Sequence, residues 1–205
     1  MTPDDVDILE RQTVFRGYFR IDRYRLRHRT FAGGWTGEIL REVFERGHAV
    51  AVLLYDPALD QVVLIEQFRI GAHAAGRPAW LLEIVAGIIG EGESVEEVAR
   101  RETLEETGCT AADLIPIGDY LPTPGGSSET VSLFCARIDA RTAGGIHGLA
   151  HEHEDIRTVV MGAGEIIARL EDGRLDNSAI MIAVAWLARN RERLRALWGD
   201  GAPAR

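Results

Sequence analysis

Glutamate side chains recur at helical spacing between residues 87 and 109 of this chain. Glu102 and Glu106 are one helical turn apart, and Glu105 follows Glu102 by three residues, so a helix places all three carboxylates on one side. Like charges held this close repel one another and bring no stability by themselves. A hard divalent cation that takes oxygen ligands relieves the repulsion. The spacing therefore indicates a site for a cation such as Mg²⁺.

The same spacing is also typical of a solvated helix face on which glutamates and arginines pair. For an arbitrary helix of this composition we favour that interpretation. The segment before the helix changes the balance, because Ala86 and Gly87 end an apolar stretch close to the helix start. Backbone groups are thereby brought toward the carboxylates.

Residues 87–109 resemble the box of the Nudix hydrolases, in which a glycine, a glutamate and the run Arg-Glu-x-x-Glu-Glu stand at fixed intervals before a closing glycine. The positions that match in register are Gly87, Glu93, Arg101, Glu102, Glu105, Glu106 and Gly108. Thr103 departs from the pattern, since an aliphatic residue is usual there, and Cys109 occupies the last apolar position. Both are small enough to pack, so we expect catalysis to be unaffected.

The resemblance implies a metal-binding core. Glu102 and Glu106 are expected to bind Mg²⁺ directly, and Glu105 to serve one ion or a bridging water. The backbone carbonyl of Ala86 is expected to be a further ligand, and Mn²⁺ is the alternative metal. Such ions neutralise phosphate oxygens, polarise phosphorus and lower the pKa of a bound water.

The remaining box positions are given a structural role by the same resemblance. Glu93 and Arg101 are expected to pair and to hold the loop on the helix. Gly87 opens the box at the end of a strand, and Gly108 closes it just past the helix end.

Longer stretches resemble the bacterial ADP-ribose pyrophosphatases among the Nudix enzymes. Pro124, 16 residues after Gly108, stands about where those enzymes carry a characteristic proline, although a lone proline before two glycines is equally a turn residue. The likeness covers roughly residues 12 to 195 and includes the stretches RGYFRIDRYRLRHR, REVFERGHAVAVLLYDP, VVLIEQFR, WLLEIVAG and GIHGLAHEHEDIR. It implies Mg²⁺-dependent hydrolysis of ADP-ribose to AMP and ribose 5-phosphate by attack of a metal-activated water on the diphosphate.

A distant acidic loop is expected to complete the site. By the resemblance, residues 144–155 correspond to a mobile loop that closes over the substrate. Glu152 is then the residue that activates or orients the attacking water, together with Glu105 of the box, and Glu154 is an additional metal ligand. The alternative is a flexible acidic surface loop.

Substrate contacts are also implied by the resemblance. Tyr18 or Phe19 is expected to stack on adenine, contributed by a partner subunit, and Glu129 to hydrogen-bond ribose hydroxyls. The full set of expected substrate-binding residues is Tyr18, Phe19, Arg41, Arg69, Ile88, Thr123 and Glu129. Single arginines and aromatic residues are more often structural than functional.

The elements that must position these residues follow from the pattern. The box helix is expected over 94–107, with Ser94 and Glu97 as a capping box. We predict strands at 23–29, 35–44, 49–56, 61–68, 80–90, 114–121, 129–138 and 156–161, loops at 71–78 and 141–155, and helices at 164–171 and 177–197. The fold class is α/β (α+β), an α/β/α sandwich with a mixed sheet.

A small β domain is expected over residues 1–47, before a catalytic domain at 48–205. Arginines alternate with Tyr24, Leu26 and His28 over 23–29. The preferred interpretation is that these arginines form a solvated face of the sheet. So small a sheet cannot bury much surface alone. The resemblance implies that it is exchanged between the subunits of a homodimer.

Composition excludes several classes of function. The formal net charge of −9 argues against nucleic acid as a partner, and all 23 basic Lys/Arg positions are arginine, so side-chain phosphate contacts must be guanidinium or histidine. No apolar run could span a membrane and no secretory leader is recognised, so we expect a cytoplasmic protein. Cys109 and Cys135 are expected to be buried. His151 and His153 are not expected to form a zinc site, because no third His or Cys stands at ligand spacing.

Two other functions stay open. The first is a Nudix hydrolase of another nucleoside diphosphate sugar, such as GDP-mannose. The second is a module that binds ADP-ribose without cleaving it, for which lost box glutamates would be the expected sign; none is lost here.

Overall fold

The computed structural model describes residues 2–149, 151 and 153–199. It divides into two compact units. The first consists of Met1–His48 and Leu121–Thr130, and the second of Ala49–Tyr120 and Val131–Arg205. The first unit is therefore built from two separate stretches of the chain.

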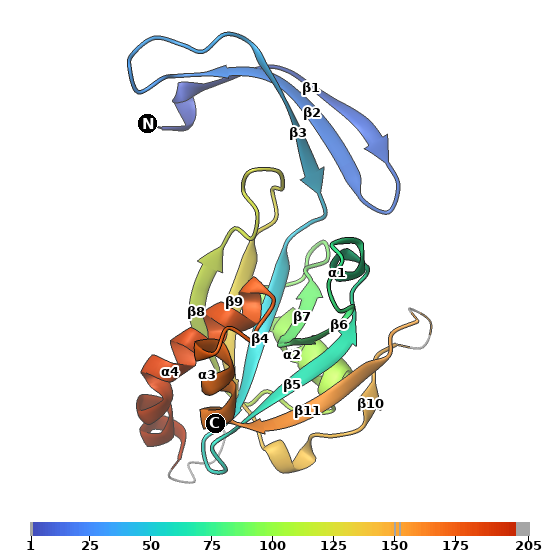
Figure 1. Ribbon diagram of the computed structural model, residues 1–205, viewed down its shortest axis with the longest axis vertical. Coiled ribbons are helices and arrows are strands. Elements are labelled where there is room, and N and C mark those ends of the chain that lie inside the picture. Colours follow the sequence, from blue (N-terminus) through green and yellow to red (C-terminus); the bar gives the residue numbers. More distant parts are fainter. Residues whose placement is uncertain (1, 150, 152, 200–205) are drawn as a thin grey trace. The chain divides into compact units, whose positions relative to one another are not determined.

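The first unit contains an antiparallel sheet in the order β1-β2-β3 (Figure 1). Its elements are the 3-10 helix η1 (Pro3–Asp5) and strands β1 (Val6–Arg16), β2 (Arg20–His28) and β3 (Ile39–Glu45). Strand β1 is not among the predicted strands, the first of which begins at residue 23. The acidic N-terminus becomes a strand because its carboxylates meet the arginines of β2, as in the pairs Asp7–Arg27 and Glu10–Arg25.

The strand predicted over 35–44 starts only at Ile39. Two successive glycines, Gly33 and Gly34, adopt positive φ angles of 91° and 80°, and Trp35 forms only an isolated bridge with Arg29. Positive φ angles turn the chain away from the pleated conformation. The turn therefore extends further than the apolar pattern suggests.

The second unit is organised around a mixed sheet in the order β10-β11-β5-β4-β9-β8, with β6 pairing β5 and β7 pairing β4. Strands β4 and β9 are parallel, and the other described pairs of this sheet are antiparallel. The strands are β4 (Ala49–Asp56), β5 (Gln61–Phe68), β6 (Trp80–Glu83), β7 (Val85–Ile88), β8 (Leu114–Tyr120), β9 (Val131–Arg137), β10 (Ile146–His147) and β11 (Ile156–Gly162). The helices are α1 (Ile70–Ala74), α2 (Val95–Thr107), α3 (Ala163–Glu171) and α4 (Ser178–Trp198), with the 3-10 helix η2 (Ala140–Thr142).

Alternation along β4 divides the core into two layers. Leu53 and its odd-numbered neighbours pack with residues of α3 and α4, whereas Val52 and its even-numbered neighbours pack with Val98 and Ala99 of α2. Figure 1 shows α3 and α4 on one face of this sheet and α2 on the other. The predicted α/β/α sandwich with a mixed sheet is confirmed.

Two local predictions differ from the structure. The single strand expected over 80–90 is divided at the buried Ile84, because β6 pairs with β5 while β7 pairs with β4. The segment expected as a loop over 71–78 contains the short helix α1. Which strands pair in a sheet depends on tertiary contacts, so the residue pattern of one strand does not predict its neighbours.

Both cysteines are buried, as predicted, and neither forms a disulfide. Across residues 2–149, 151 and 153–199, we find no helix with the length and apolar character that crossing a membrane requires.

Candidate active site

Helix α2 carries the box glutamates and is fixed at both ends by local signals. The Ser94 hydroxyl accepts from the Glu97 amide, and the Glu97 carboxylate accepts from the Ser94 backbone N–H at 2.9 Å. Gly108 ends the helix in the left-handed region with φ of 71°. The predicted helix limits and capping box are thus present.

Strand β7 passes very close to α2 at Gly87. A Cβ atom at this position would lie 2.0 Å from Oε1 and 2.2 Å from Cδ of Glu102. The glycine is needed here for space, and its φ angle is not positive. The missing side chain is what lets the Glu102 carboxylate lie against the backbone that precedes the helix.

Arg101 is bonded to three carboxylates of the box. Its guanidinium lies 3.3 Å from Glu93, and Nη1 donates to Glu102 at 2.9 Å and to Glu105 at 3.1 Å. Glu93 also accepts from the Gly90 amide at 2.8 Å. The arginine therefore joins the loop to the helix and offsets part of the repulsion among the glutamates.

Glu106 is the deeply buried carboxylate of the box, only 4% exposed. Its Oε2 accepts from the backbone N–H of Ala86 at 3.2 Å. Burial raises the pKa of Glu106 to about 8; the Ala86 hydrogen bond and Arg69 act in the opposite direction, and the negative charges of Glu102 and Glu154 raise it further. An ionised Glu106 thus needs a nearby positive charge.

The pKa of Glu102 is also raised. Burial raises its pKa above the ordinary value, Arg101 counteracts this, and the charges of Glu105 and Glu154 add to the increase. Glu154, from the loop before β11, thus lies close enough to influence both Glu102 and Glu106. Its Oε2 accepts from the Leu149 amide at 3.1 Å, which closes that loop on itself.

The residue expected to activate the water, Glu152, lies outside the described residues. The start of the same loop approaches the box helix: a Cβ atom at Gly108 would lie 3.1 Å from Cε1 of His147 in β10. Strand β10 thereby brings the loop to the end of α2.

Arg69 is held by a carboxylate that sequence reasoning missed. Its Nε and Nη2 donate to Oε2 of Glu83 at 2.9 and 2.7 Å, and Gln67 donates to the same oxygen at 3.3 Å. Glu83 could have been found as the one charged residue inside the apolar stretch WLLEIVAG. Ile88, another expected contact, ends β7 and is 41% exposed.

The other expected substrate contacts belong to the first unit: Tyr18, Phe19, Arg41, Thr123 and Glu129. Tyr18 is 89% exposed, and its ring meets Phe19 edge-on. Arg41 donates to the carbonyl of Leu40, and the Thr123 carbonyl accepts from the Gly126 and Ser127 amides. Glu129 is 8% exposed and pairs with Arg46 at 3.3 Å.

The donor set of the second unit suits a hard cation. Glu102, Glu106 and Glu154 are linked by their mutual charge effects, and burial makes the ionised form of two of them costly. Within the described part of the chain, no three His, Cys, Asp or Glu side chains already form a metal-ligating group. Arg101 and the Ala86 amide engage the box carboxylates instead.

The lining of a cavity of about 320 Å³ in the second unit includes none of the box residues. It is lined by Glu66, Trp80, Ile146, Asp155 and Arg157. None of the expected catalytic or metal-binding residues lines it. The shape of the surface therefore does not identify the candidate site. The site is identified by the buried carboxylates of Glu102 and Glu106, which lie against the backbone of Ala86 and Gly87.

Comparison with known proteins accounts for this arrangement. The family model for the NUDIX domain matches residues 45–180. The chain belongs to the Nudix family. The match contains all of α2, the preceding strand β7 and the loop that carries Glu154.

Relatives share most of the chain's length. An ADP-ribose pyrophosphatase from Escherichia coli strain K12 is 49% identical over 195 residues, which is 95% of this chain and 93% of that protein. A GDP-mannose pyrophosphatase from Pectobacterium atrosepticum is 33% identical over 86% of this chain and 91% of its own length. A solved structure titled as an ADP compounds hydrolase shares the fold, with a TM-score of 0.68 at 24% identity, covering 91% of this chain and 96% of that one.

Proposed function

We propose that this Nudix enzyme hydrolyses ADP-ribose to AMP and ribose 5-phosphate. The observation that carries the proposal is the 49% identity to the Escherichia coli ADP-ribose pyrophosphatase, which extends over 95% of this chain. The intact cluster around Gly87, Arg101 and Glu102 supports catalysis over mere binding, because it assembles the carboxylates that a diphosphate hydrolase requires.

The proposed cofactor is Mg²⁺, with Mn²⁺ as the alternative. The residues that would hold it are Glu102, Glu105, Glu106, Glu154 and the backbone carbonyl of Ala86. A divalent ion there supplies charge neutralisation at the diphosphate and a more acidic bound water. Support comes from the pKa values of Glu102 and Glu106, which are raised first by burial and further by neighbouring carboxylates, so that a bound cation would favour their ionised forms.

The protein's own groups have distinct tasks in this proposal. Arg101 fixes the directions of the Glu102 and Glu105 carboxylates. Arg69, held by Glu83, is aligned to offset phosphate charge. Glu152 takes the proton from the attacking water at its carboxylate, with Glu105 as the box residue that helps to orient it. The products follow when the bond between phosphorus and the bridging oxygen breaks.

Adenosine recognition is proposed to come from the first unit. Tyr18 or Phe19 stacks on adenine, and Glu129 accepts hydrogen bonds from ribose hydroxyls. Arg41 and Thr123 of the first unit, and Ile88 of the second, are further proposed contacts. In this proposal the partner subunit of a homodimer supplies the adenine-stacking ring, and its three-stranded sheet is exchanged between subunits. If light scattering finds a monomer under conditions in which the enzyme is active, the prediction of an obligate homodimer is wrong.

A substrate panel is the decisive experiment. The purified chain is incubated in Mg²⁺ with ADP-ribose, ADP-glucose and GDP-mannose, and phosphomonoester release is measured with a coupled phosphatase. We expect ADP-ribose to give the highest kcat/KM. Preference for GDP-mannose would favour the function of the Pectobacterium atrosepticum relative. Tight binding of ADP-ribose without AMP formation would favour a binding module.

The proposed base needs its own test. Glu152→Gln keeps the size of the side chain and removes its ability to take a proton. We expect kcat to fall by about 10²-fold or more, with a smaller effect on KM. A drop of less than about threefold would move the role to the box glutamates.

A further inference from the structure

Strands β10 and β11 bring the two ends of the acidic loop together. His147 pairs with Ile156 in the antiparallel ladder, and the loop between them includes Glu154, which we propose as a metal ligand. Burial is the largest cause of the raised pKa values of Glu102 and Glu106, and the negative charge of Glu154 adds to both. The contacts that fix Glu154 within its loop therefore bear on the geometry of the whole metal site.

Gly148, the residue after β10, packs against the backbone of Glu154. A Cβ atom at position 148 would lie 2.6 Å from Cβ of Glu154 and 3.1 Å from its carbonyl oxygen. The φ angle of Gly148 is 100°, in a region that residues with side chains rarely adopt. Because the atoms in the way are backbone atoms and the first side-chain carbon, Glu154 could not avoid a larger residue by rotating its carboxylate. A side chain at position 148 would therefore displace Glu154 as a whole residue.

The next residue, Leu149, holds the carboxylate itself. Its amide donates to Oε2 of Glu154 at 3.1 Å, and the Glu154 amide donates to the Leu149 carbonyl at 3.4 Å. The two residues are thus joined through both backbone and side chain. A hydrogen bond to one carboxylate oxygen restricts the rotation of the carboxylate and leaves Oε1 available to a cation. Gly148 and Leu149 together therefore fix where Glu154 stands and how its carboxylate is turned.

His147 connects the start of this loop to the box helix. Its Nε2 lies 2.7 Å from the Gly144 carbonyl, and because a carbonyl only accepts, Nε2 is the donor in this bond. The ring lies against Gly108, where a Cβ atom would come within 3.1 Å of Cε1. Gly108 ends α2, the helix that carries the box glutamates. The start of the loop is thus placed against the end of that helix.

We propose that Gly148 is a positioning residue for Glu154, and that His147 places the same loop on α2. Gly148 lets the chain turn tightly enough for the Leu149 amide to reach the carboxylate, and His147 ties this arrangement to the helix. The two residues thereby set the spacing between Glu154 and the box glutamates, although neither is itself a proposed metal ligand. The inference rests on the proposed function, because it concerns how the proposed metal site is assembled.

The test measures Mn²⁺ binding to the purified chain without substrate, from the loss of the free-ion electron paramagnetic resonance signal. We expect Gly148→Ala to weaken Mn²⁺ binding by about 10-fold or more, because groups that orient metal ligands typically contribute about 10- to 100-fold to affinity. Parent-like Mn²⁺ affinity in a Gly148→Ala variant that is folded by circular dichroism would overturn the proposal. A chain that binds Mn²⁺ but does not cleave ADP-ribose would refute the proposed function, while the Gly148 comparison still decides this inference.

Gly145 offers a matched control in the same loop. Its φ of 94° is close to that of Gly148, but the nearest atom to a Cβ there would be 3.8 Å away, an ordinary contact. Gly145→Ala therefore introduces a similar backbone strain without displacing Glu154. We expect its Mn²⁺ affinity to equal that of the parent. An equal loss in both glycine variants would show that loop strain alone weakens binding, and would contradict a role for the contact with Glu154.

A double-mutant cycle shows whether both residues act through Glu154. Glu154→Gln removes the charge of the proposed ligand, so Gly148→Ala or His147→Ala in this background should weaken Mn²⁺ binding little further. Additive losses would refute the positioning role. His147→Gln keeps a side-chain N–H for the Gly144 carbonyl, so it should recover part of the affinity that His147→Ala loses. Equal affinities in the two His147 variants would contradict a role for the Nε2 bond.

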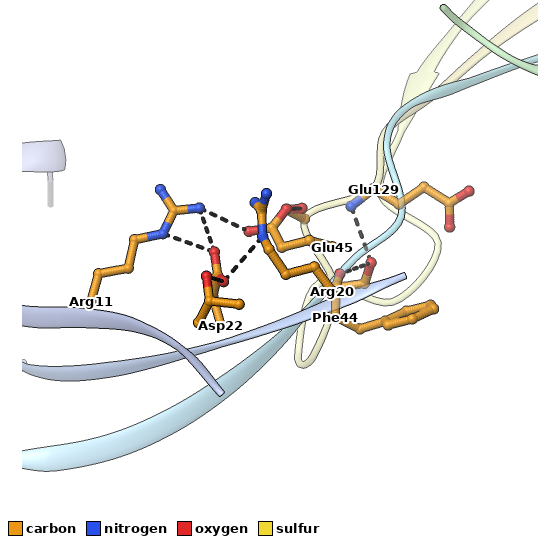
Figure 2. A network of polar contacts seen from close by, with 9 residues as sticks. Arg11, Arg20, Asp22, Phe44, Glu45 and Glu129 are labelled. Atoms are coloured by element: carbon orange, nitrogen blue, oxygen red, sulfur yellow. Dashed lines mark hydrogen bonds and ion pairs between the residues drawn. The ribbon is translucent and has the colours of Figure 1, made fainter. Parts of the chain in front are cut away.

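A destabilised variant of the first unit separates positioning from general damage. Asp22, only 1% exposed, accepts from Arg11 at 2.6 Å and lies 3.1 Å from Nε of Arg20, and Figure 2 shows both arginines directed at it. Arg11→Gln removes one of these charges, so we expect a lower melting temperature with unchanged Mn²⁺ affinity. Weaker Mn²⁺ binding in this variant would mean that affinity follows overall stability, and would contradict the proposal.

Discussion

Gly87 and Glu102 lie so close that a Cβ atom at position 87 would be 2.0 Å from the glutamate's Oε1. Gly87→Ala should therefore displace the Glu102 carboxylate, whose flexible side chain can move while the backbone stays in place. We expect kcat/KM to fall by about 10²-fold, with a change in melting temperature of only a few degrees. Kinetics and thermal unfolding measure the two effects.

A matched glycine replacement is available in α3. The nearest atom to a Cβ at Gly164 is 4.0 Å away, an ordinary contact. Gly164→Ala should keep full activity and gain slight stability from helix propensity. If Gly87→Ala were as active as this control, the close approach would have no role in catalysis.

Glu102→Gln tests the proposed metal site. The substitution keeps the side chain's shape but removes a charged ligand, so we expect kcat to fall by about 10²- to 10³-fold and half-saturation to require more Mg²⁺. Glu96→Gln, on the exposed side of the same helix, is the control and should be unchanged. Near-normal turnover in Glu102→Gln would refute the metal-site assignment.

Glu83→Gln tests the carboxylate beneath Arg69. A neutral amide still accepts one hydrogen bond but no longer holds two guanidinium nitrogens by charge. We expect KM for ADP-ribose to rise by about 5- to 10-fold, because Arg69 loses its fixed direction. Glu165→Gln in α3, which loses an exposed pair with Arg169, serves as the comparison. Identical KM values for the two variants would contradict a role for Glu83.

Asp60 connects the turn between β4 and β5 to α4, and its contribution should depend on pH. Its carboxylate accepts from Tyr55 and from Nε of Arg191, each at 2.8 Å. The Arg191 hydrogen bond, ahead of the Tyr55 bond and the arginine charges, holds the pKa of Asp60 below its ordinary value. Because the folded-state pKa is depressed, the stabilisation is present above about pH 4 and is lost as pH falls through the folded-state pKa.

Asp60→Asn should lower the free energy of unfolding by about 2 kcal/mol at pH 7. The difference between variant and parent should shrink as pH falls below 4, because the parent's carboxylate becomes neutral. Asparagine tolerates the positive φ of 57° at this position, so backbone strain is not a factor. Urea unfolding at pH 7 and pH 3 measures both values. A difference that is constant with pH would exclude a charge effect.

Local signals explain what the sequence could predict. The capping box at Ser94 and the left-handed Gly108 define α2 within the chain itself, and a continuous apolar, β-branched run defines β4. Contacts between distant residues explain what was missed. Strand β1 depends on arginines of β2, and the role of Glu83, at the end of β6, depends on its contact with Arg69, which follows β5.

The first unit is made of two stretches that leave the ribosome at different times. The Ser127 hydroxyl meets the Phe44 carbonyl across 83 positions of the chain. At a translation rate of about 5–20 residues per second, residues 126–130 are synthesised on the order of ten seconds after the end of β3. Helix α2 is synthesised within that interval, so the contacts between the end of β3 and residues 126–130 can form only after the catalytic helix has been synthesised.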